Sequence, residues 1–192
     1  MHEVNIVEQS VADLVDYFSV PISFEVRTIL DVRAVDEGWG GFVLTEQQIE
    51  TPYVKDYDAV QDEPSLEWSQ RWDISNWGVL SVFVSSSRVG GCVMAFDTPG
   101  IHKLEDRKDV IALWDLRVHP DHRRKGIGAQ LFQSAEEWAR KRGCRLLRVE
   151  TQNINVPACR FYRRQGCVLG AIDRYAYAEF PEEVELEWFK EL

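Results

Sequence analysis

The residues best suited to chemistry lie in one short window of the chain, residues 113–129. An apolar run ends in this window, a basic stretch follows, and two glycines then begin a helical pattern. The pattern R-x-x-G-x-G is formed by Arg123, Gly126 and Gly128, with Arg124 and Lys125 between them. The first amides of a helix have no partner inside the helix, and glycine lets an anion approach the backbone closely. The window therefore predicts a cradle for a diphosphate.

Other interpretations of the glycine pair remain open from this pattern alone. A P-loop needs G-x-x-x-x-G-K-[ST] and a dinucleotide fingerprint needs G-x-G-x-x-G, and the window matches neither. A tight glycine turn into an ordinary helix is the simplest alternative. A second motif favours a ligand site, since Asn155, Ala158, Tyr162 and Gly166 stand at the spacing N-x-x-A-x-x-x-Y-x-x-x-G.

Alternating strands and helices must position these residues. Residues 79–84 and 90–96 are apolar, β-branched runs that predict an antiparallel hairpin. Residues 110–118 predict the next strand, residues 126–142 an amphipathic helix, and residues 145–151 another strand. Asn155 can cap a second helix that ends at Gly166, and residues 168–178 and 184–189 predict further strands. In the first half, residues 22–35 predict an extended segment and residues 45–77 predict short helices and loops.

The length and composition favour a single α/β domain over residues 1–192. Hydrophobic residues make up 45% of the chain and seven are Trp, which excludes a disordered protein. No apolar stretch approaches the roughly 20 residues that a membrane-spanning helix needs. The net charge of −10 argues against a nucleic-acid partner.

The charge is unevenly distributed along the chain. Residues 36–73 contain ten acids against two bases, and residues 179–192 contain six acids against one base. Residues 117–148 reverse the sign, with nine bases against three acids. We expect the basic stretch to bind an anionic ligand and the acidic segments to attract a cationic one, although surface charge that serves solubility alone is an alternative.

The cysteines give no sign of a metal site or of disulfides. Cys92, Cys144, Cys159 and Cys167 include no C-x-x-C pair, and the acidic start of the chain does not resemble a secretory signal. We therefore predict buried thiols, no metal and a cytoplasmic protein.

Two groups of residues resemble the GNAT superfamily of acetyl-CoA-dependent N-acetyltransferases. The first joins Leu116-Arg117-Val118 to Arg123-Arg124-Lys125-Gly126-Ile127-Gly128-Ala129, and the second is the motif from Asn155 to Gly166. Residues 138–140, 149–153, 184–188 and 52–57 are similar to streptothricin acetyltransferases. The resemblance implies a mixed, mostly antiparallel central sheet flanked by helices, with a V-shaped cleft for acetyl-CoA.

The resemblance also implies how acetyl-CoA is bound as co-substrate. Backbone groups of Leu116, Arg117 and Val118 would pair with the pantetheine arm and polarise the thioester carbonyl. The pyrophosphate would lie on the loop and helix start formed by Arg123, Arg124, Lys125, Gly126, Ile127, Gly128 and Ala129. Asn155 and Ala158 would contact the cofactor near the start of the second helix.

Three residues are candidates for catalysis. Tyr162 occupies the family position of the general acid that protonates the departing thiolate, and a packed core aromatic is the alternative. Asp115 and Glu150 are candidates to accept the proton of the amine, and structural pairing with Arg117 or Arg148 is the alternative for each. Direct transfer is expected, without an acetyl-enzyme on a cysteine.

The expected acceptor is a primary amine of a cationic small molecule. Streptothricin, and with it antibiotic resistance, fits the acidic segments, and so does a polyamine, an aminoglycoside or a protein lysine. The alternatives are acetylation of a protein or peptide amine, and a non-catalytic acetyl-CoA-binding module. A homodimer is compatible with the sequence.

Overall fold

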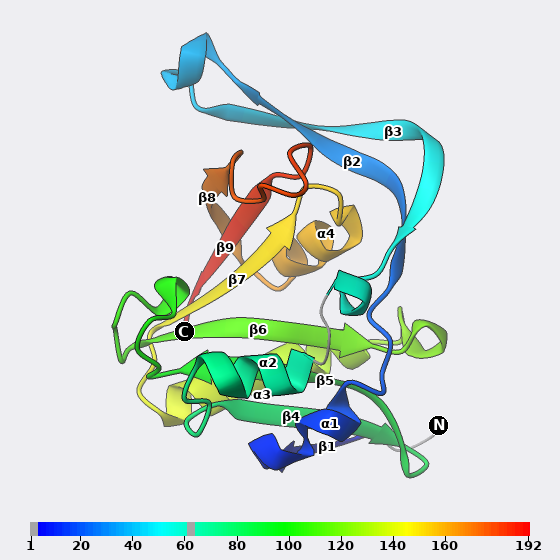
Figure 1. The fold of residues 1–192 in the computed structure, drawn as a ribbon, viewed down its shortest axis with the longest axis vertical. Helices are drawn as coiled ribbons and strands as arrows, with labels where there is room; N and C mark the ends of the chain where they lie inside the picture. The colour runs from blue at the N-terminus through cyan, green and yellow to red at the C-terminus, as the bar shows by residue number, and fades with distance from the viewer. Residues whose placement is uncertain (1–3, 61–63) are drawn as a thin grey trace. The chain divides into compact units, whose positions relative to one another are not determined.

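The computed structural model describes residues 4–60 and 64–192, which group into two compact units (Figure 1). Unit 1 comprises Met1–Ser23, Asp56–Val149 and Lys190–Leu192, and unit 2 comprises Phe24–Lys55 and Glu150–Phe189. Of the acidic residues counted above, Asp62 and Glu63 lie outside the described residues. The single-domain organisation expected for residues 1–192 stays a prediction.

Unit 1 is built on a sheet in the order β1-β4-β5-β6-β7. Its strands are β1 (Val4–Gln9), β4 (Gly78–Val84), β5 (Ser87–Phe96), β6 (Val110–Val118) and the first residues of β7 (Leu146–Gln152). The first four strands are antiparallel to their neighbours, and β7 runs parallel to β6. Between these parallel strands the chain forms α3 (Ile127–Lys141), as the strand–helix–strand pattern predicts. The predicted α/β class and the mixed, mostly antiparallel sheet are confirmed.

Short helices complete unit 1. They are α1 (Leu14–Tyr17), α2 (Pro64–Arg71) and the single 3₁₀ turns η1 (Val11–Asp13), η3 (Asp58–Val60), η4 (His102–Leu104) and η5 (Pro120–His122). Among the described residues, no helix is long and apolar enough to cross a membrane.

The core of unit 1 contains most of the tryptophans. Trp68 and Trp77 are buried together with the apolar faces of β4, β5 and β6, and their ring centroids lie 5.7 Å apart. Trp114 of β6 packs edge-on against Trp72 at 5.1 Å. Helix α3 buries the predicted apolar stripe, including Leu131, and packs against β4, β5 and β6.

A β-bulge interrupts β6 where the sequence predicts the ligand site. The register with β5 moves from the pair Val93–Asp115 to the pair Met94–Leu113, which leaves Trp114 as the extra residue. Residues 110–113 pair with residues 146–149 of β7. Within the described part of the chain, residues 115–118 pair with β5 and not with β7, so this stretch of β6 has no second strand beside it.

Unit 2 contains a long two-stranded ribbon and a helix with two further strands. β2 (Phe24–Ala34) and β3 (Phe42–Lys55) pair antiparallel around the turn η2 (Asp36–Gly38). Helix α4 (Val156–Arg164) precedes β8 (Val168–Asp173), which pairs antiparallel with β9 (Glu185–Glu191).

The structure corrects two predictions of secondary structure and shows one strand that was not predicted. Residues 45–55 belong to β3 rather than to short helices and loops, because backbone pairing with β2 holds a strand whose side chains are mostly exposed and polar. The strand predicted over residues 168–178 ends at Asp173, and a loop follows. Strand β1 was not predicted, since its short sequence shows little alternation and its pairing with β4 depends on distant residues.

Candidate active site

The predicted anion-binding segment of unit 1 is the turn that joins β6 to α3, and an arginine side chain holds this turn by a hydrogen bond to the backbone. The Arg123 guanidinium donates a hydrogen bond from Nε to the carbonyl of Val118, the last residue of β6, at 2.8 Å. Gly126 has φ of +84°, a left-handed conformation that glycine adopts without strain, and α3 begins at the next residue. No side chain caps this helix, so its first amides remain available to an anion.

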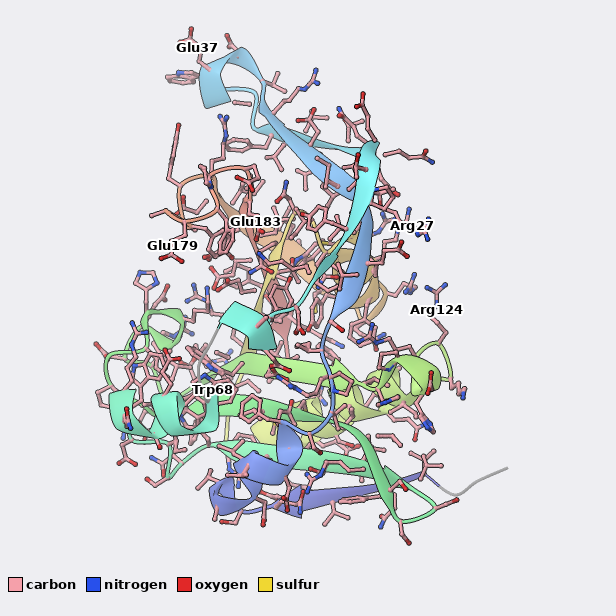
Figure 2. The ribbon with its side chains drawn as sticks, turned by 45° about the vertical axis from the view of Figure 1, so that its right-hand side comes forward. Arg27, Glu37, Trp68, Arg124, Glu179 and Glu183 are labelled. Atoms are coloured by element: carbon pink, nitrogen blue, oxygen red, sulfur yellow. The ribbon has the colours of Figure 1, made fainter. Side chains whose placement is uncertain are left out.

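Three cations surround this turn. Arg124 and Lys125 are exposed, and Figure 2 shows Arg124 extending away from the ribbon. Arg123 is half-buried, and burial lowers its pKa. The positive end of the helix dipole and these side chains together favour a phosphate-bearing ligand.

Asp115 of unit 1 is enclosed by a charged network. Arg117 donates to both of its carboxylate oxygens, at 3.0 Å from Nε and 2.7 Å from Nη2, and the Tyr17 hydroxyl donates a further hydrogen bond. Arg117 also donates to Asp58 at 3.0 and 3.1 Å and to the carbonyl of Val20 at 3.0 Å. The side chains of Arg117 and Asp115 are 1% and 9% exposed. The structural pairing with Arg117 that the sequence left open is therefore present.

Electrostatic interactions stabilise this network. Burial opposes the charge on Arg117, but the Asp115 carboxylate and its hydrogen bonds more than offset this and raise the pKa of Arg117. Burial and the neighbouring Asp115 carboxylate raise the pKa of Tyr17, so its hydroxyl stays protonated and acts as a donor. Asp115 thus neutralises a buried cation.

Glu150, the other candidate base, has a different environment in unit 2. The Tyr177 hydroxyl donates to its Oε1 at 2.5 Å, and the Gln152 amide donates to the same oxygen at 3.3 Å. The Gln152 amide also donates to the Tyr177 hydroxyl at 2.9 Å, which closes a three-residue cluster. Both donors are neutral groups. Burial and the Glu150 carboxylate raise the pKa of Tyr177, so the phenol is protonated at neutral pH.

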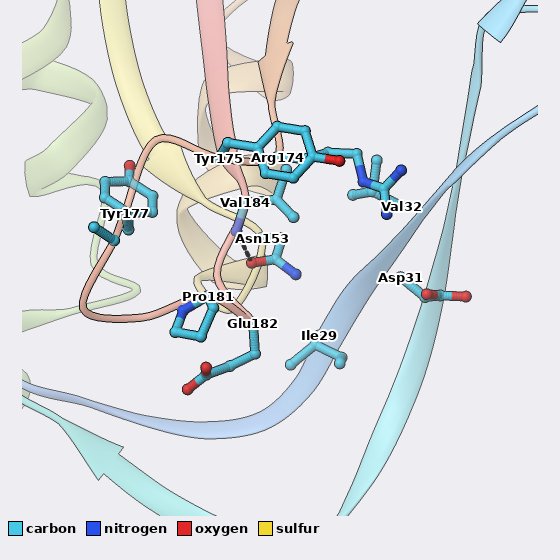
Figure 3. Close-up of a pocket in the computed structure, with 11 residues that line it drawn as sticks. Ile29, Asp31, Val32, Asn153, Arg174, Tyr175, Tyr177, Pro181, Glu182 and Val184 are labelled. Carbon is cyan, nitrogen blue, oxygen red and sulfur yellow. Dashed lines mark hydrogen bonds between the residues drawn. The ribbon is translucent and has the colours of Figure 1, made fainter. Parts of the chain in front are cut away.

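A cavity of about 410 Å³ lies in unit 2 next to this cluster (Figure 3). Its lining combines apolar, aromatic and charged side chains: Ile29, Asp31, Val32, Asn153, Arg174, Tyr175, Tyr177, Ala178, Pro181, Glu182 and Val184. Figure 3 shows Ile29 on the β2 strand and Tyr177 and Glu182 on the loop that carries Arg174 and Tyr175. Its size and mixed lining suit a small organic ligand with a charged group.

Hydrogen bonds and one ion pair hold the walls of this cavity in place. Asn153 accepts a hydrogen bond from the Val184 amide at 2.8 Å and donates one to the Leu30 carbonyl at 3.0 Å, which joins the loop end to β2. Near the loop end, the buried side chains of Lys55 and Glu183 pair at 2.5 Å. The cavity is therefore formed before a ligand arrives, which reduces the ordering cost of binding.

Comparison with known proteins identifies the family. The model of the acetyltransferase (GNAT) family matches residues 44–167, which include the β6–α3 turn and α4. This chain belongs to that family. Family membership confirms the predicted acyltransferase class.

Two curated relatives of this acetyltransferase carry a substrate in their names. Streptothricin acetyltransferase from Escherichia coli is 30% identical over 190 residues, which cover 97% of this chain and 94% of that protein. Streptothricin acetyltransferase A from Bacillus subtilis (strain 168) is 27% identical over 152 residues, which cover 78% of this chain and 80% of that protein. The predicted likeness to streptothricin acetyltransferases is confirmed.

A solved structure with the same fold holds a ligand. A candidate streptothricin acetyltransferase from Bacillus anthracis str. Ames, in complex with acetyl coenzyme A, superimposes with a TM-score of 0.76. The match covers 99% of this chain and 100% of the other at 22% identity. The fold is therefore one that accommodates the co-substrate expected from the sequence.

The predicted site residues of the acetyltransferase divide between the two units. Unit 1 holds Asp115, Leu116, Arg117, Val118 and the run Arg123, Arg124, Lys125, Gly126, Ile127, Gly128 and Ala129. Unit 2 holds Glu150, Asn155, Ala158 and Tyr162. Within each unit these residues are close in sequence, so a single strand–helix segment brings them together. Their roles towards acetyl-CoA stay predictions.

Helix α4 presents the second motif as the sequence predicts. The Asn155 side chain accepts a hydrogen bond from the Ala158 amide at 3.2 Å, which confirms the helix cap. Tyr162 is 6% exposed and meets the ring of Phe161 edge-on at 5.2 Å. Tyr162 is thus packed, and its role as general acid stays a prediction.

Several acids of the predicted steering segments form structural pairs instead. Asp58 binds Arg117, Glu46 binds Arg160, and Glu183 binds Lys55. Glu182 is exposed, lines the cavity and forms no hydrogen bond or ion pair with the described residues. Among the described acids of these two segments, Glu182 is therefore the one that lines the cavity.

The cysteines are buried free thiols, as predicted. Burial raises the pKa of Cys159 to about 11, so this thiol is almost fully protonated at neutral pH and is a poor nucleophile. The residues that sequence reasoning missed are Gln152 and Tyr177. Gln152 lies two positions from Glu150 on one face of a strand, which is a usable signal, whereas Tyr177 has no signal in the sequence.

Proposed function

We propose that this acetyltransferase moves the acetyl group of acetyl-CoA to a primary amine of a cationic small molecule, with streptothricin as the first acceptor to test. The observation that carries the proposal is the β6–α3 turn, where left-handed Gly126, helix amides without a side-chain cap and three cations lie together and would hold a diphosphate. The acceptor is supported by 30% identity to the Escherichia coli streptothricin acetyltransferase over nearly the whole chain.

Unit 1 would bind and activate the donor. Arg123, Arg124 and Lys125, with the first amides of α3, would hold the pyrophosphate. The backbone of residues 116–118 pairs with β5 on one edge, and its other edge would bind the pantetheine arm and polarise the thioester carbonyl.

The chemical step needs one proton acceptor and one proton donor. Glu150 takes a proton from the acceptor ammonium, and the neutral amine attacks the thioester carbonyl carbon. The new C–N bond forms, the C–S bond breaks, and Tyr162 gives its proton to the departing CoA thiolate. The nitrogen still carries an extra proton after the C–N bond forms and releases it to solvent. Tyr162 regains a proton as Glu150 gives up the one it took, so the products are a neutral amide, free CoA and one proton in solution. Transfer is direct, because the protonated Cys159 thiol is a poor acyl carrier.

The cavity of unit 2 is the proposed site for the amine-bearing arm of the acceptor. Ile29, Val32 and Val184 offer apolar contacts to an alkyl chain, and the tyrosine rings and Glu182 favour an ammonium group. Arg174 in the same lining disfavours a second cation close by, so one ammonium group fits better than several.

A free-thiol assay tests the proposal. Purified protein and acetyl-CoA are mixed with streptothricin, an aminoglycoside, spermidine or a lysyl peptide, and CoA release is followed. We expect the highest kcat/KM with streptothricin, and cells that express the chain should grow at streptothricin concentrations that stop control cells. Preference for the peptide would favour the protein-acetylating alternative, and no CoA release with any amine would favour a binding module.

Two matched variants test the acceptor site. Glu182→Gln should raise the KM for streptothricin about fivefold and leave the KM for acetyl-CoA unchanged, because it removes one charge from the cavity. Glu179→Gln is the control, since Glu179 is an exposed acid on the same loop that does not line the cavity (Figure 2). Equal KM values for streptothricin in the two variants would show that Glu182 does not contribute to acceptor binding.

The expected cytoplasmic location and the homodimeric state also stay proposals. Sedimentation of the purified chain measures the second directly.

A further inference from the structure

Tyr177 occupies a position that the proposed mechanism leaves without a role. Its ring lines the 410 Å³ cavity, and its hydroxyl donates to Glu150 at 2.5 Å. The residue thus contacts both the proposed proton acceptor and the space proposed for the amine. None of the residues that resemble the family includes it.

The geometry of the cluster fixes the Glu150 side chain. Two donors from different parts of unit 2, the Tyr177 hydroxyl and the Gln152 amide, meet at the same carboxylate oxygen. The Gln152 amide also donates to the Tyr177 oxygen at 2.9 Å, which orients the phenol. A carboxylate held by two donors has little rotational freedom, so the amine proton meets it in one geometry.

The charge state of Tyr177 suits this role. Burial and the Glu150 carboxylate raise its pKa, so the phenol remains a donor throughout the working pH range. A donor to a carboxylate stabilises the ionised form, which is the form that accepts a proton. Other charges lie near this group or line the same cavity, and they are Glu185, Asp31, Glu182 and Arg174.

We infer that Tyr177 is a positioning residue for acetyl transfer, which holds the Glu150 carboxylate through its hydroxyl and forms with its ring a wall of the acceptor cavity. The inference rests on the proposed function. The hydroxyl is expected to affect the rate of the chemical step, and the ring is expected to affect binding of the amine.

Two substitutions of Tyr177 separate these contributions. Tyr177→Phe keeps the ring, so kcat should fall about tenfold while the KM for the amine changes less than twofold. Tyr177→Leu removes the ring as well and should raise the KM for the amine about fivefold, because its contact with the ammonium is lost.

Tyr53→Phe is the matched control. Tyr53 is another tyrosine of unit 2 whose pKa is raised by burial and by the nearby carboxylates of Glu183 and Glu182, and it does not line the cavity. Its rate and pH profile should equal those of the parent protein. Thermal unfolding of each variant shows whether it folds.

A double-mutant cycle with Glu150→Gln decides whether Tyr177 acts through Glu150. If it does, Tyr177→Phe has less than a twofold effect on kcat in the Glu150→Gln background. An unchanged tenfold effect in that background would overturn the inference, and so would a Tyr177→Phe variant whose kcat equals that of Tyr53→Phe. These failures leave the proposed function intact, whereas a parent protein that acetylates no amine overturns both.

Discussion

The two candidate proton acceptors, Asp115 in unit 1 and Glu150 in unit 2, are both carboxylates on strands with hydrogen-bonded tyrosines. Asp115 accepts hydrogen bonds from the Tyr17 hydroxyl and from Nε and Nη2 of Arg117, whose side chain is buried. Glu150 receives the Tyr177 hydroxyl and the Gln152 amide, which carry no charge. Asp115 is thus bound to a buried cation, whereas the tyrosine that binds Glu150 also lines the cavity of unit 2.

Burial and the paired cation favour a structural role for Asp115. Its side chain is 9% exposed and is bound to a guanidinium that is itself buried, so it balances that charge inside unit 1. Glu150 is bound by Tyr177, which lines the cavity of unit 2, so its carboxylate lies beside the space proposed for the amine. We therefore propose a structural role for Asp115 and a chemical role for Glu150.

The largest expected effect is on the rate of the Glu150→Gln variant. Loss of the proton acceptor should lower kcat about a thousandfold at neutral pH, measured by CoA release with saturating amine. Asp115→Asn is the comparison and should lower kcat less than tenfold while it reduces the free energy of unfolding. The opposite ranking of the two kcat values would reverse the assignment.

The next largest effect is on the stability of the Arg117→Ala variant. Removal of Arg117 leaves the Asp115 carboxylate buried without its cation, so the free energy of unfolding should fall by about 3 kcal/mol in urea denaturation. Arg107→Ala is the control, because the Arg107–Asp109 pair is exposed and its loss should change the free energy of unfolding little. A loss below that of the control would show that the network of Asp115 does not stabilise unit 1.

A smaller effect is expected for donor binding in the Gly126→Ala variant. Alanine at φ of +84° strains the turn that begins α3, and the KM for acetyl-CoA should rise about tenfold while the KM for the amine stays constant. Gly100→Ala has nearly the same backbone conformation, at φ of +83°, with no neighbouring atom within 4 Å in either case. Both variants should lose about 1 kcal/mol of stability. An equal KM for acetyl-CoA in the two variants would show that the α3 turn does not hold the cofactor.

The smallest effect is expected at Cys159. With a pKa of about 11, roughly one Cys159 thiol in a thousand is ionised at pH 8, and the fraction rises tenfold with each pH unit. Cys159→Ala should therefore keep kcat within twofold of the parent, and no acetylated protein should appear in mass spectra of a mixture with acetyl-CoA. A stable acetyl adduct on Cys159 would contradict direct transfer.

The sequence predicts those structural features that depend on residues close together in the chain. The R-x-x-G-x-G turn, the Asn155 cap and the amphipathic face of α3 were all predicted, because glycine conformation, side-chain capping and helical periodicity are local properties. The segment 45–55 was not predicted as strand, because its polar side chains carry no alternation and only its pairing with β2 makes it extended.

The sequence by itself indicated the family, the glycine turn that begins α3 and the two carboxylates proposed as proton acceptors. Only the tertiary structure separated those carboxylates, by bringing Tyr17 and Asp58 to Arg117 and Asp115 and by bringing Tyr177 to Glu150. The physical reason is that the protonation chemistry of a carboxylate depends on the charge and hydrogen bonds within a few ångströms, and here those groups come from residues distant in sequence.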